Sequence, residues 1–318
     1  MERVAQEVQG YAHIPVMLEE VLALAPPGPA PWILDATFGR GGHSRALLAR
    51  LGPEARLFAL DRDPEALAAA HALAAEDPRV TVVPSPFGAL AEALAPHLKG
   101  RGLDGVLMDL GVSSPQLDDP TRGFSFRNDG PLDMRMSGEG QSAADVLAQC
   151  EEGELARIFK ELGEERFARR IARALVAARE SGVVFTRTRQ LAEAVAEAHP
   201  AWSPDRHPAT RVFMALRLYV NDELGQLEAG LRGAVDLLAP AGRLLVISFH
   251  SLEDRIVKRF LRREAQGEPL PRGLPVRGLA PGVRLRLLGK GQGPSAEELA
   301  RNPRARSARL RAAERLVA

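Results

Sequence analysis

The stretch PWILDATFGRGGHSRALLARL, residues 31–51, decides the fold class of this chain. It begins with a short apolar run that ends at Asp35, continues into a glycine-rich turn, and closes with the apolar spacing of a helix. Glycines let a backbone turn sharply and approach a ligand closely, and the following helix directs its free N–H groups at that ligand. The stretch therefore predicts a strand, a ligand-binding turn and a helix.

The alternation of strand-like and helical patterns recurs on both sides of a long interruption, which covers residues 112–217. Before the interruption, strand-like runs alternate with helical patterns, and Asp63 is the expected N-cap of one of these helices, with Pro64 at its first position. Strands separated by helices indicate right-handed βαβ units in a parallel sheet. We therefore predict an α/β, Rossmann-like fold. The predicted strands cover 55–63, 79–85, 104–111 and 242–251, with weaker candidates at 283–289 and 305–316, and the predicted helices cover 64–75, 87–98, 222–238 and 252–263.

The interruption has a different composition. Residues 111–142 are rich in Gly, Pro, Asp and Ser and predict a long irregular loop, which in a compact domain is usually functional. Helical patterns follow as far as residue 198, and no buried strand is expected between 112 and 217. We predict a Rossmann-like α/β domain formed by residues 1–112 and 218–318, interrupted by an all-helical domain of residues 113–217.

The composition excludes several classes of site. The chain has 318 residues and one cysteine, so an intrachain disulfide and a Cys-based zinc site are excluded, and Cys150 is expected to be a small buried apolar residue. No apolar run is long enough to cross a bilayer, no secretory signal is visible, and no His, Asp and Glu set has metal-ligand spacing. We expect a cytoplasmic protein without a membrane partner or a metal.

Acidic residues beside the glycine turn indicate which nucleotide it binds. Asp61 follows Gly42 at a spacing that suits a carboxylate accepting both ribose hydroxyls of an adenosine. Ser44 occupies the place of the third glycine of the dinucleotide fingerprint. A carboxylate at Asp35 would repel a pyrophosphate and attract an ammonium and a sulfonium group. The pattern favours S-adenosylmethionine over NAD, FAD or ATP.

Two further strand ends are expected at the same crevice. Phe87, after the third strand, either packs on an adenine or is an ordinary core residue. Asp109, after the fourth strand, has too short and polar a neighbourhood to fill a core, so we expect it in the site.

At these residues the sequence resembles a known family, the bacterial small-subunit ribosomal RNA cytosine 4-amino methyltransferases (RsmH, formerly MraW). The resemblance covers most of the chain in one order, through the blocks HIPVMLEE, DATFGRGGHS, LDRDPEA, DLGVSSPQLDDPTRGFSFRNDGPLDMRM, GEERFARRIARAL, HPATRVFMALRLYVNDEL, ISFHSLEDRIVKRF and NPRARSARLRAAER.

The resemblance implies a class I methyltransferase with a helical insert after the fourth strand. It implies that the substrate is a cytosine of 16S rRNA at the decoding centre, presented on the assembled small subunit and methylated on its exocyclic 4-amino group. It also implies that S-adenosylmethionine is bound by Gly41, Gly42, His43, Asp61, Phe87, Asp109 and Gln116.

The residue that accepts the hydrogens of the target amine stays open. DNA amino-methyltransferases use a short Asp/Asn/Ser-Pro-Pro-aromatic motif after the fourth strand, but here Asp109 is followed by Leu-Gly-Val-Ser113-Ser114-Pro115 with no aromatic. Our candidates for catalysis are Asp109 and Ser113. Phe124 or Phe126 either stacks the exposed base or anchors the long loop.

Arginines supply nearly all the positive charge of a chain whose net charge is only +1. Several recur at helical spacing in the insert, where they either contact RNA phosphates or form a solvated face paired with glutamates. His207 and His250 are the histidines best placed for a substrate role, although a single histidine more often serves the structure. The arginine candidates are Arg166, Arg169, Arg170, Arg173, Arg187, Arg189, Arg211, Arg304, Arg306 and Arg309.

Three other functions remain to be weighed. A nucleotide-dependent oxidoreductase would share the fold, but Asp35 and Ser44 argue against a diphosphate cofactor. A ribosome-assembly factor with a vestigial pocket would not need the intact site residues. A methyltransferase could also act on DNA or protein, and only the family resemblance selects ribosomal RNA.

Overall fold

In a computed structural model, the chain is described over residues 15–28, 30–201, 207–267 and 280–317. It separates into two compact units, the first made of residues 1–111 and 225–318 and the second of residues 112–224. The insert ends later than the expected residue 217, because α11 (Ala209–Val220) packs on α7 (Ala143–Gln149), α8 (Glu152–Glu161) and α10 (Thr188–Ala198).

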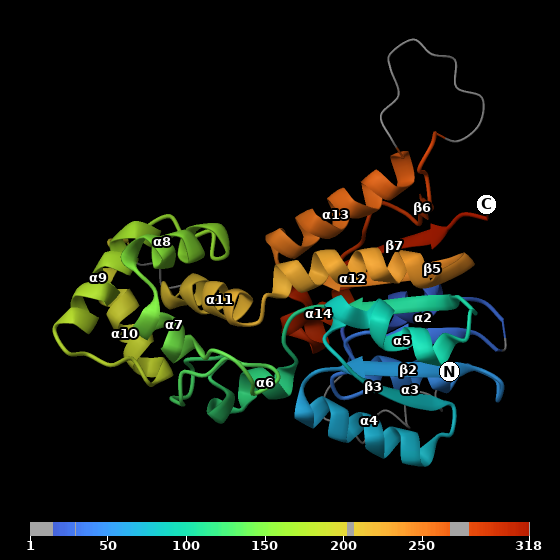
Figure 1. The fold of residues 1–318 in the computed structure, drawn as a ribbon, viewed down its shortest axis with the longest axis horizontal. Coiled ribbons are helices and arrows are strands. Elements are labelled where there is room, and N and C mark those ends of the chain that lie inside the picture. The colour runs from blue at the N-terminus through green and yellow to red at the C-terminus, as the bar shows by residue number, and fades with distance from the viewer. Residues whose placement is uncertain (1–14, 29, 202–206, 268–279, 318) are drawn as a thin grey trace, which may run out of the picture. The chain divides into compact units, whose positions relative to one another are not determined.

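A seven-stranded sheet forms the centre of the first unit, with the order β3-β2-β1-β4-β5-β7-β6 (Figure 1). The pairs from β3 through β5 are parallel, whereas β7 runs antiparallel to both β5 and β6. This mixed sheet confirms the predicted α/β, Rossmann-like fold, including both weaker strand candidates. The strands are β1 (Trp32–Asp35), β2 (Arg56–Asp61), β3 (Val80–Pro84), β4 (Leu103–Asp109), β5 (Leu238–Ser248), β6 (Leu285–Leu287) and β7 (Arg309–Arg315).

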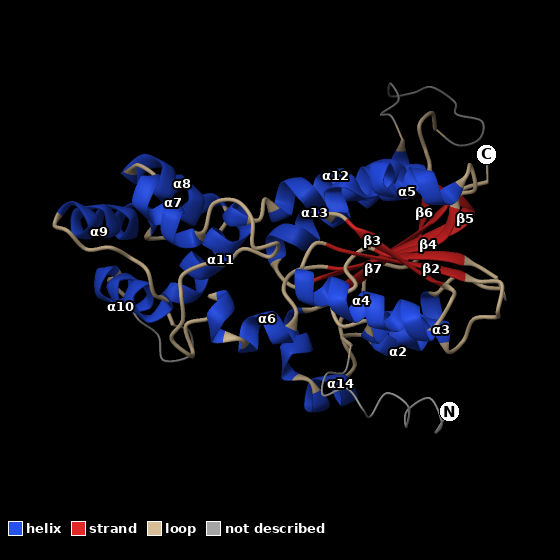
Figure 2. Cartoon of the chain, turned by 60° about the horizontal axis from the view of Figure 1, so that its bottom comes forward, coloured by secondary structure: helices blue, strands red, loops and turns tan. Residues whose placement is uncertain are grey.

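Helices cover both faces of this sheet (Figure 2). Side chains alternate between the faces: Leu34 of β1 packs in the cluster with α5, α12 and α13, while Ile33 packs with α2, α3 and α4. Asp63 caps α4 by accepting the N–H of Glu65, as predicted. The helices are α2 (Leu18–Leu24), α3 (Gly42–Leu48), α4 (Pro64–Glu76), α5 (Leu90–Leu98), α12 (Glu223–Leu237), α13 (Ser251–Gln266) and α14 (Ala296–Arg301).

The second unit is helical and has its own hydrophobic core, to which Cys150 belongs. Cys150 is buried, as expected, and burial raises the pKa of its thiol to about 11. The predicted loop at 111–142 is not wholly irregular, since it contains α6 (Ser114–Asp118) and a short 3₁₀ turn (Pro120–Arg122). The other helices are α7 (Ala143–Gln149), α8 (Glu152–Glu161), α9 (Ala168–Glu180) and α10 (Thr188–Ala198).

The order of the strands reverses between β1 and β4, because β2 and β3 lie on one side of β1 and β4 and β5 lie on the other. Ligands of open α/β sheets bind outside the carboxyl ends of the strands at such a reversal. The fold therefore directs attention to the residues that end β2, β1 and β4.

Candidate functional site

Three adjacent strands each end in an aspartate. Asp61 ends β2, Asp35 ends β1 and Asp109 ends β4, and the pairing of these strands brings all three carboxyl groups to one edge of the sheet. Burial raises the pKa of each carboxyl group above its usual value. This edge of the sheet therefore gathers three carboxyl groups whose ionised forms are poorly solvated.

Asp35 lies deeper than the sequence suggested. Its side chain is buried, and it accepts the hydroxyl of Ser44 at 2.7 Å and the backbone N–H of Thr37 at 3.3 Å. Burial is the largest influence on its pKa, which rises to about 6. Asp35 thus ties the start of α3 to β1. A glycine at position 44, as in the dinucleotide fingerprint, could not form this bond to Asp35.

Asp61 is surrounded by backbone donors. Its Oδ2 accepts the N–H of Gly39 at 2.9 Å, and its Oδ1 accepts the N–H groups of Arg62 and Asp63 at 2.7 and 2.9 Å. Carboxylate oxygens have further lone pairs, so these bonds hold the group in place while leaving it able to accept hydroxyls. Sequence reasoning located Asp61 but missed its role in fixing the glycine turn.

The glycine turn owes its composition to backbone and packing together. Gly39 and Gly41 both have positive φ, at +56° and +76°. A Cβ at Gly41 would lie 2.5 Å from the Phe38 ring, and one at Gly42 would lie 2.4 Å from Pro15. Gly41 and Gly42 therefore let the turn pack tightly against Phe38 and Pro15, in addition to their expected approach to the ligand.

His43 is buried at the start of α3 and is held from two sides. Its Nε2 lies 2.9 Å from the carbonyl oxygen of Val16, which can only accept, so Nε2 carries a hydrogen. Its Nδ1 then faces Asp109 Oδ2 at 3.7 Å. The N-terminal block that contains Val16 thus sets the tautomer of a histidine beside a site carboxylate.

Asp109 has the least satisfied carboxyl group of the three. Its backbone N–H donates to Thr37 Oγ1 at 2.6 Å, but its buried Oδ1 has no hydrogen-bond partner among the described residues. Burial, followed by the charges of Asp35, Glu253 and Glu298, raises its pKa well above the usual value. A buried acceptor without a donor indicates a ligand that brings a cation or an N–H group.

Phe87 lies at the carboxyl end of β3 and is only partly buried. Its ring packs on α12, where a Cβ at Gly230 would lie 2.8 Å from it, and the N–H of the neighbouring Gly88 donates to Gln226 at 3.1 Å. Phe87 is therefore positioned by α12 and keeps part of its surface outside the core. The sequence did not show that α12 supports this turn.

Glu298, from the C-terminal part of the chain, supports the segment of residues 15–17, which we call the N-terminal arm and whose Val16 carbonyl oxygen contacts His43. Glu298 of α14 accepts the backbone N–H of Met17 at 2.7 Å, and Met17 is fully buried with a positive φ of 55°. Sequence reasoning missed Glu298, because no pattern links two residues so far apart in the chain.

Ser113 and Gln116, which belong to the second unit, bond to each other. The Ser113 hydroxyl accepts the N–H of Gln116, and the Gln116 side chain accepts the N–H of Ser113 at 2.8 Å. This capping box gives both residues a structural role at the start of α6.

The aromatic residues of the long loop pack inside the second unit. Phe124 is buried in its core, which favours anchoring over base stacking. Phe126 is partly buried, and its ring centroid lies 4.8 Å from those of His207 and Phe213. His207 is thus a packing partner of the loop.

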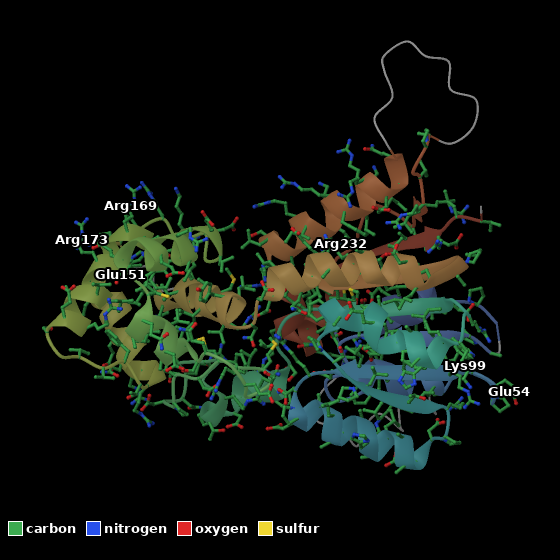
Figure 3. All side chains as sticks on the ribbon, viewed as in Figure 1. Glu54, Lys99, Glu151, Arg169, Arg173 and Arg232 are labelled. Atoms are coloured by element: carbon green, nitrogen blue, oxygen red, sulfur yellow. The ribbon has the colours of Figure 1, made fainter. Side chains whose placement is uncertain are left out.

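The arginine candidates fall into two groups. Arg187 pairs with Asp129 at 2.5 Å, and Arg211 donates to the carbonyl oxygen of Glu164 at 3.1 Å, so both serve the structure. Arg173 lies 3.5 Å from Glu152. Figure 3 shows Arg169 and Arg173 extending outward from α9. Besides Arg187, the exposed candidates are Arg166, Arg169, Arg170, Arg173, Arg189, Arg304, Arg306 and Arg309.

His250 caps α13 rather than facing open space. Its Nδ1 accepts the N–H of Glu253, and its Nε2 lies 3.1 Å from Glu253 Oε1.

Within the described ranges, no helix has the length and apolar character to span a bilayer. The same part of the chain gathers no group of three His, Cys, Asp or Glu side chains that could hold a metal ion.

Comparison with known proteins gives a family match over nearly the whole chain. The MraW methylase family matches residues 10–316. The chain is also similar to the ribosomal RNA small subunit methyltransferase H of Chromohalobacter salexigens, with 53% identity over 308 residues, which are 96% of this chain and 92% of that protein.

Solved structures give weaker likenesses. A SAM-dependent O-methyltransferase from Thermotoga maritima has a TM-score of 0.44 at 8% identity, covering 99% of this chain and 72% of its own. A Streptococcus mutans protein crystallised in complex with SAH has a TM-score of 0.43 at 11% identity, covering 96% of this chain and all of its own. The fold assignment rests on the strand order of the sheet itself.

Proposed function

This chain belongs to the MraW methylase family, and we propose that it transfers a methyl group from S-adenosylmethionine to the exocyclic 4-amino group of a cytosine in 16S rRNA, at the decoding centre of the small subunit. Its relative in Chromohalobacter salexigens is a small-subunit ribosomal RNA methyltransferase by name. The first unit would supply all but one of the residues that bind the methyl donor, and the helical insert would recognise the substrate.

The buried, unpartnered oxygen of Asp109 carries this proposal. It lies at a sheet edge where the carboxyl groups of Asp35 and Asp61 add negative charge. A diphosphate at this edge would meet repulsion, whereas a ligand with ammonium and sulfonium groups would be attracted. These residues therefore fit S-adenosylmethionine and disfavour a nicotinamide cofactor.

Binding of the donor would use the residues around the glycine turn. Asp61 would accept the ribose hydroxyls, and Phe87 would pack on the adenine. Gly41, Gly42, His43, Asp109 and Gln116 complete the set that the family resemblance implies. When bound, S-adenosylmethionine supplies the methyl group on a sulfonium leaving group.

The chemistry at the substrate would centre on Asp109. The lone pair of a cytosine 4-amino group is delocalised into the ring, so a carboxylate that accepts its N–H can turn the amine and free that pair. Asp109 is the stronger of our two candidates, because its buried Oδ1 has no hydrogen-bond partner among the described residues, whereas the Ser113 hydroxyl has a structural role in capping α6. His43 Nδ1, 3.7 Å from Asp109, offers a route for the proton that the amine gives up.

The deciding experiment is to incubate the protein with labelled S-adenosylmethionine and undermethylated small subunits, and to map the labelled base. We expect label on the exocyclic amine of one cytosine, and we expect Asp109→Ala and Asp109→Asn to lose it. Label on a ring carbon or a ribose would refute the amine chemistry.

Two controls separate the catalytic role from damage to the fold. Asp104→Asn makes the same exchange near the other end of β4, where Asp104 accepts the N–H of Trp32, and it should keep activity. Ser113→Ala should retain most activity if Asp109 is the main acceptor. Tight binding of NADH in a fluorescence titration would instead favour an oxidoreductase.

A further inference from the structure

Helix α13 presents a basic outer face that the reaction chemistry does not use. Its apolar side chains Val257, Phe260 and Leu261 are buried against the sheet. On its opposite side, Lys258, Arg259 and Arg262 are exposed, and we call these three residues the α13 basic face.

The acidic residues of the same helix do not neutralise this face. Glu253 is buried at the start of the helix. Asp254 binds Arg311 through two bonds of 2.7 and 2.9 Å, and Glu264 binds Arg284 at 2.6 Å. Each carboxylate of α13 is therefore directed toward the body of the unit.

The three basic residues lie close to one another. Arg262 follows Lys258 by four residues and Arg259 by three, so all three share one side of the helix. None forms an ion pair within the described ranges, and like charges at these spacings destabilise a helix. Lys258 and Arg259 also lie before the last turn, so the helix dipole does not account for them.

The neighbouring helix α12 shows the ordinary arrangement. Its exposed Glu228, Arg232 and Asp236 follow one another at four-residue spacing with alternating sign, and Figure 3 labels Arg232. Both α12 and α13 cover the same face of the sheet (Figure 2). Their position in the fold therefore does not explain why α13 exposes only positive charges on its outer face while α12 exposes both signs.

The position of α13 connects this face to the site. The helix begins three residues after β5 ends at Ser248, at the same sheet edge as the three aspartates. The three residues of the α13 basic face lie about 10–17 Å from the first residue of the helix, measured along its axis. No exposed side chain of α13 is apolar, which argues against insertion into a membrane surface.

We propose that the α13 basic face binds the sugar-phosphate backbone of ribosomal RNA beside the target nucleotide. Arginine suits this role because its planar guanidinium bonds two phosphate oxygens at once, and lysine adds a point charge. The inference rests on the proposed function, and it adds α13 to the arginines of the insert and of residues 304–309 that the sequence suggested for RNA binding.

The test compares two triple variants with the wild type. Lys258→Gln, Arg259→Gln and Arg262→Gln together remove the α13 basic face. Arg50→Gln, Arg56→Gln and Lys99→Gln together remove three exposed charges at the opposite edge of the sheet, where Figure 3 labels Lys99. Affinity for protein-free 16S rRNA and for undermethylated small subunits is measured across salt concentrations.

Loss of three phosphate contacts should reduce the slope of log affinity against log salt by about 2, at roughly 0.7 per contact for single-stranded RNA. The α13 variant should also raise KM for small subunits while kcat and S-adenosylmethionine affinity stay at wild-type values, and the control variant should match the wild type.

Equal slopes and KM values for the two variants would overturn the inference. So would a loss of affinity for small subunits without a loss for protein-free RNA, because the face would then bind a ribosomal protein. Failure of the wild type to methylate small subunits would refute the proposed function instead, while the salt slope would still report on α13.

Discussion

At the scale of single residues, the hydroxyl of Ser44 explains a departure from the dinucleotide fingerprint. It donates to the buried carboxyl group of Asp35 at 2.7 Å. Ser44→Ala should lower the free energy of unfolding by about 1.5–3 kcal/mol, the usual value of a hydrogen bond to a charged group. Chemical denaturation measures this loss, and a Ser44→Ala protein as stable as the wild type would show that the bond contributes nothing.

The glycines of the turn provide a matched pair. Gly39 and Gly41 both have positive φ, so alanine at either costs about 1–2 kcal/mol of backbone strain. Gly41→Ala should cost more, because its Cβ would also meet the Phe38 ring at 2.5 Å, whereas the nearest atom at Gly39 is 3.9 Å away. Equal losses of unfolding free energy would contradict this steric account.

The raised pKa of Asp35 makes stability depend on pH. The folded-state pKa of about 6 exceeds the usual 3.8, so the folded protein binds the proton more tightly than the unfolded chain. This contribution is fully present below about pH 4 and is lost as the pH rises through about 6. Relative to Asp35→Asn, the wild type should therefore lose up to about 3 kcal/mol over that range. Denaturation at several pH values checks this, and a constant difference between the two proteins would count against it.

At the scale of elements, α14 stabilises the arm that precedes α2. Glu298→Ala would leave the buried N–H of Met17 without an acceptor, at a cost of about 1–3 kcal/mol in unfolding free energy. Glu298→Gln keeps an acceptor and should cost less. Because the arm positions the Val16 carbonyl on His43, the alanine variant should also bind S-adenosylmethionine more weakly in calorimetry. An unchanged affinity for S-adenosylmethionine would show that the bond between Glu298 and Met17 does not influence the site.

Much of the element pattern could be read from the sequence, because apolar periodicity reflects which face each element buries. The strands ending at Asp35, Asp61 and Asp109 and the cap at Asp63 are local features of this kind. The contact of Glu298 with Met17 and the packing of Phe87 on Gly230 depend on tertiary structure, so no local pattern announces them. The short helix α6 was missed because its few residues show no periodicity.

At the scale of the whole molecule, the two units have separate hydrophobic cores. A ligand stabilises the unit whose folded form binds it. S-adenosylmethionine should therefore slow hydrogen exchange around β1, β2 and β4 while leaving α8, α9 and α10 unchanged. Hydrogen-exchange mass spectrometry measures this by segment, and equal protection of both units would indicate that they respond together.

The antiparallel strand β7 lies between β5 and β6, and this has a consequence for biosynthesis. Sixty residues, 249–308, separate the end of β5 from the start of β7, and among the described strands β6 pairs with β7 alone. At 5–20 residues per second, a ribosome needs about 3–12 s to make the intervening segment. During that interval the nascent chain must keep the free edge of β5 from pairing with other polypeptides.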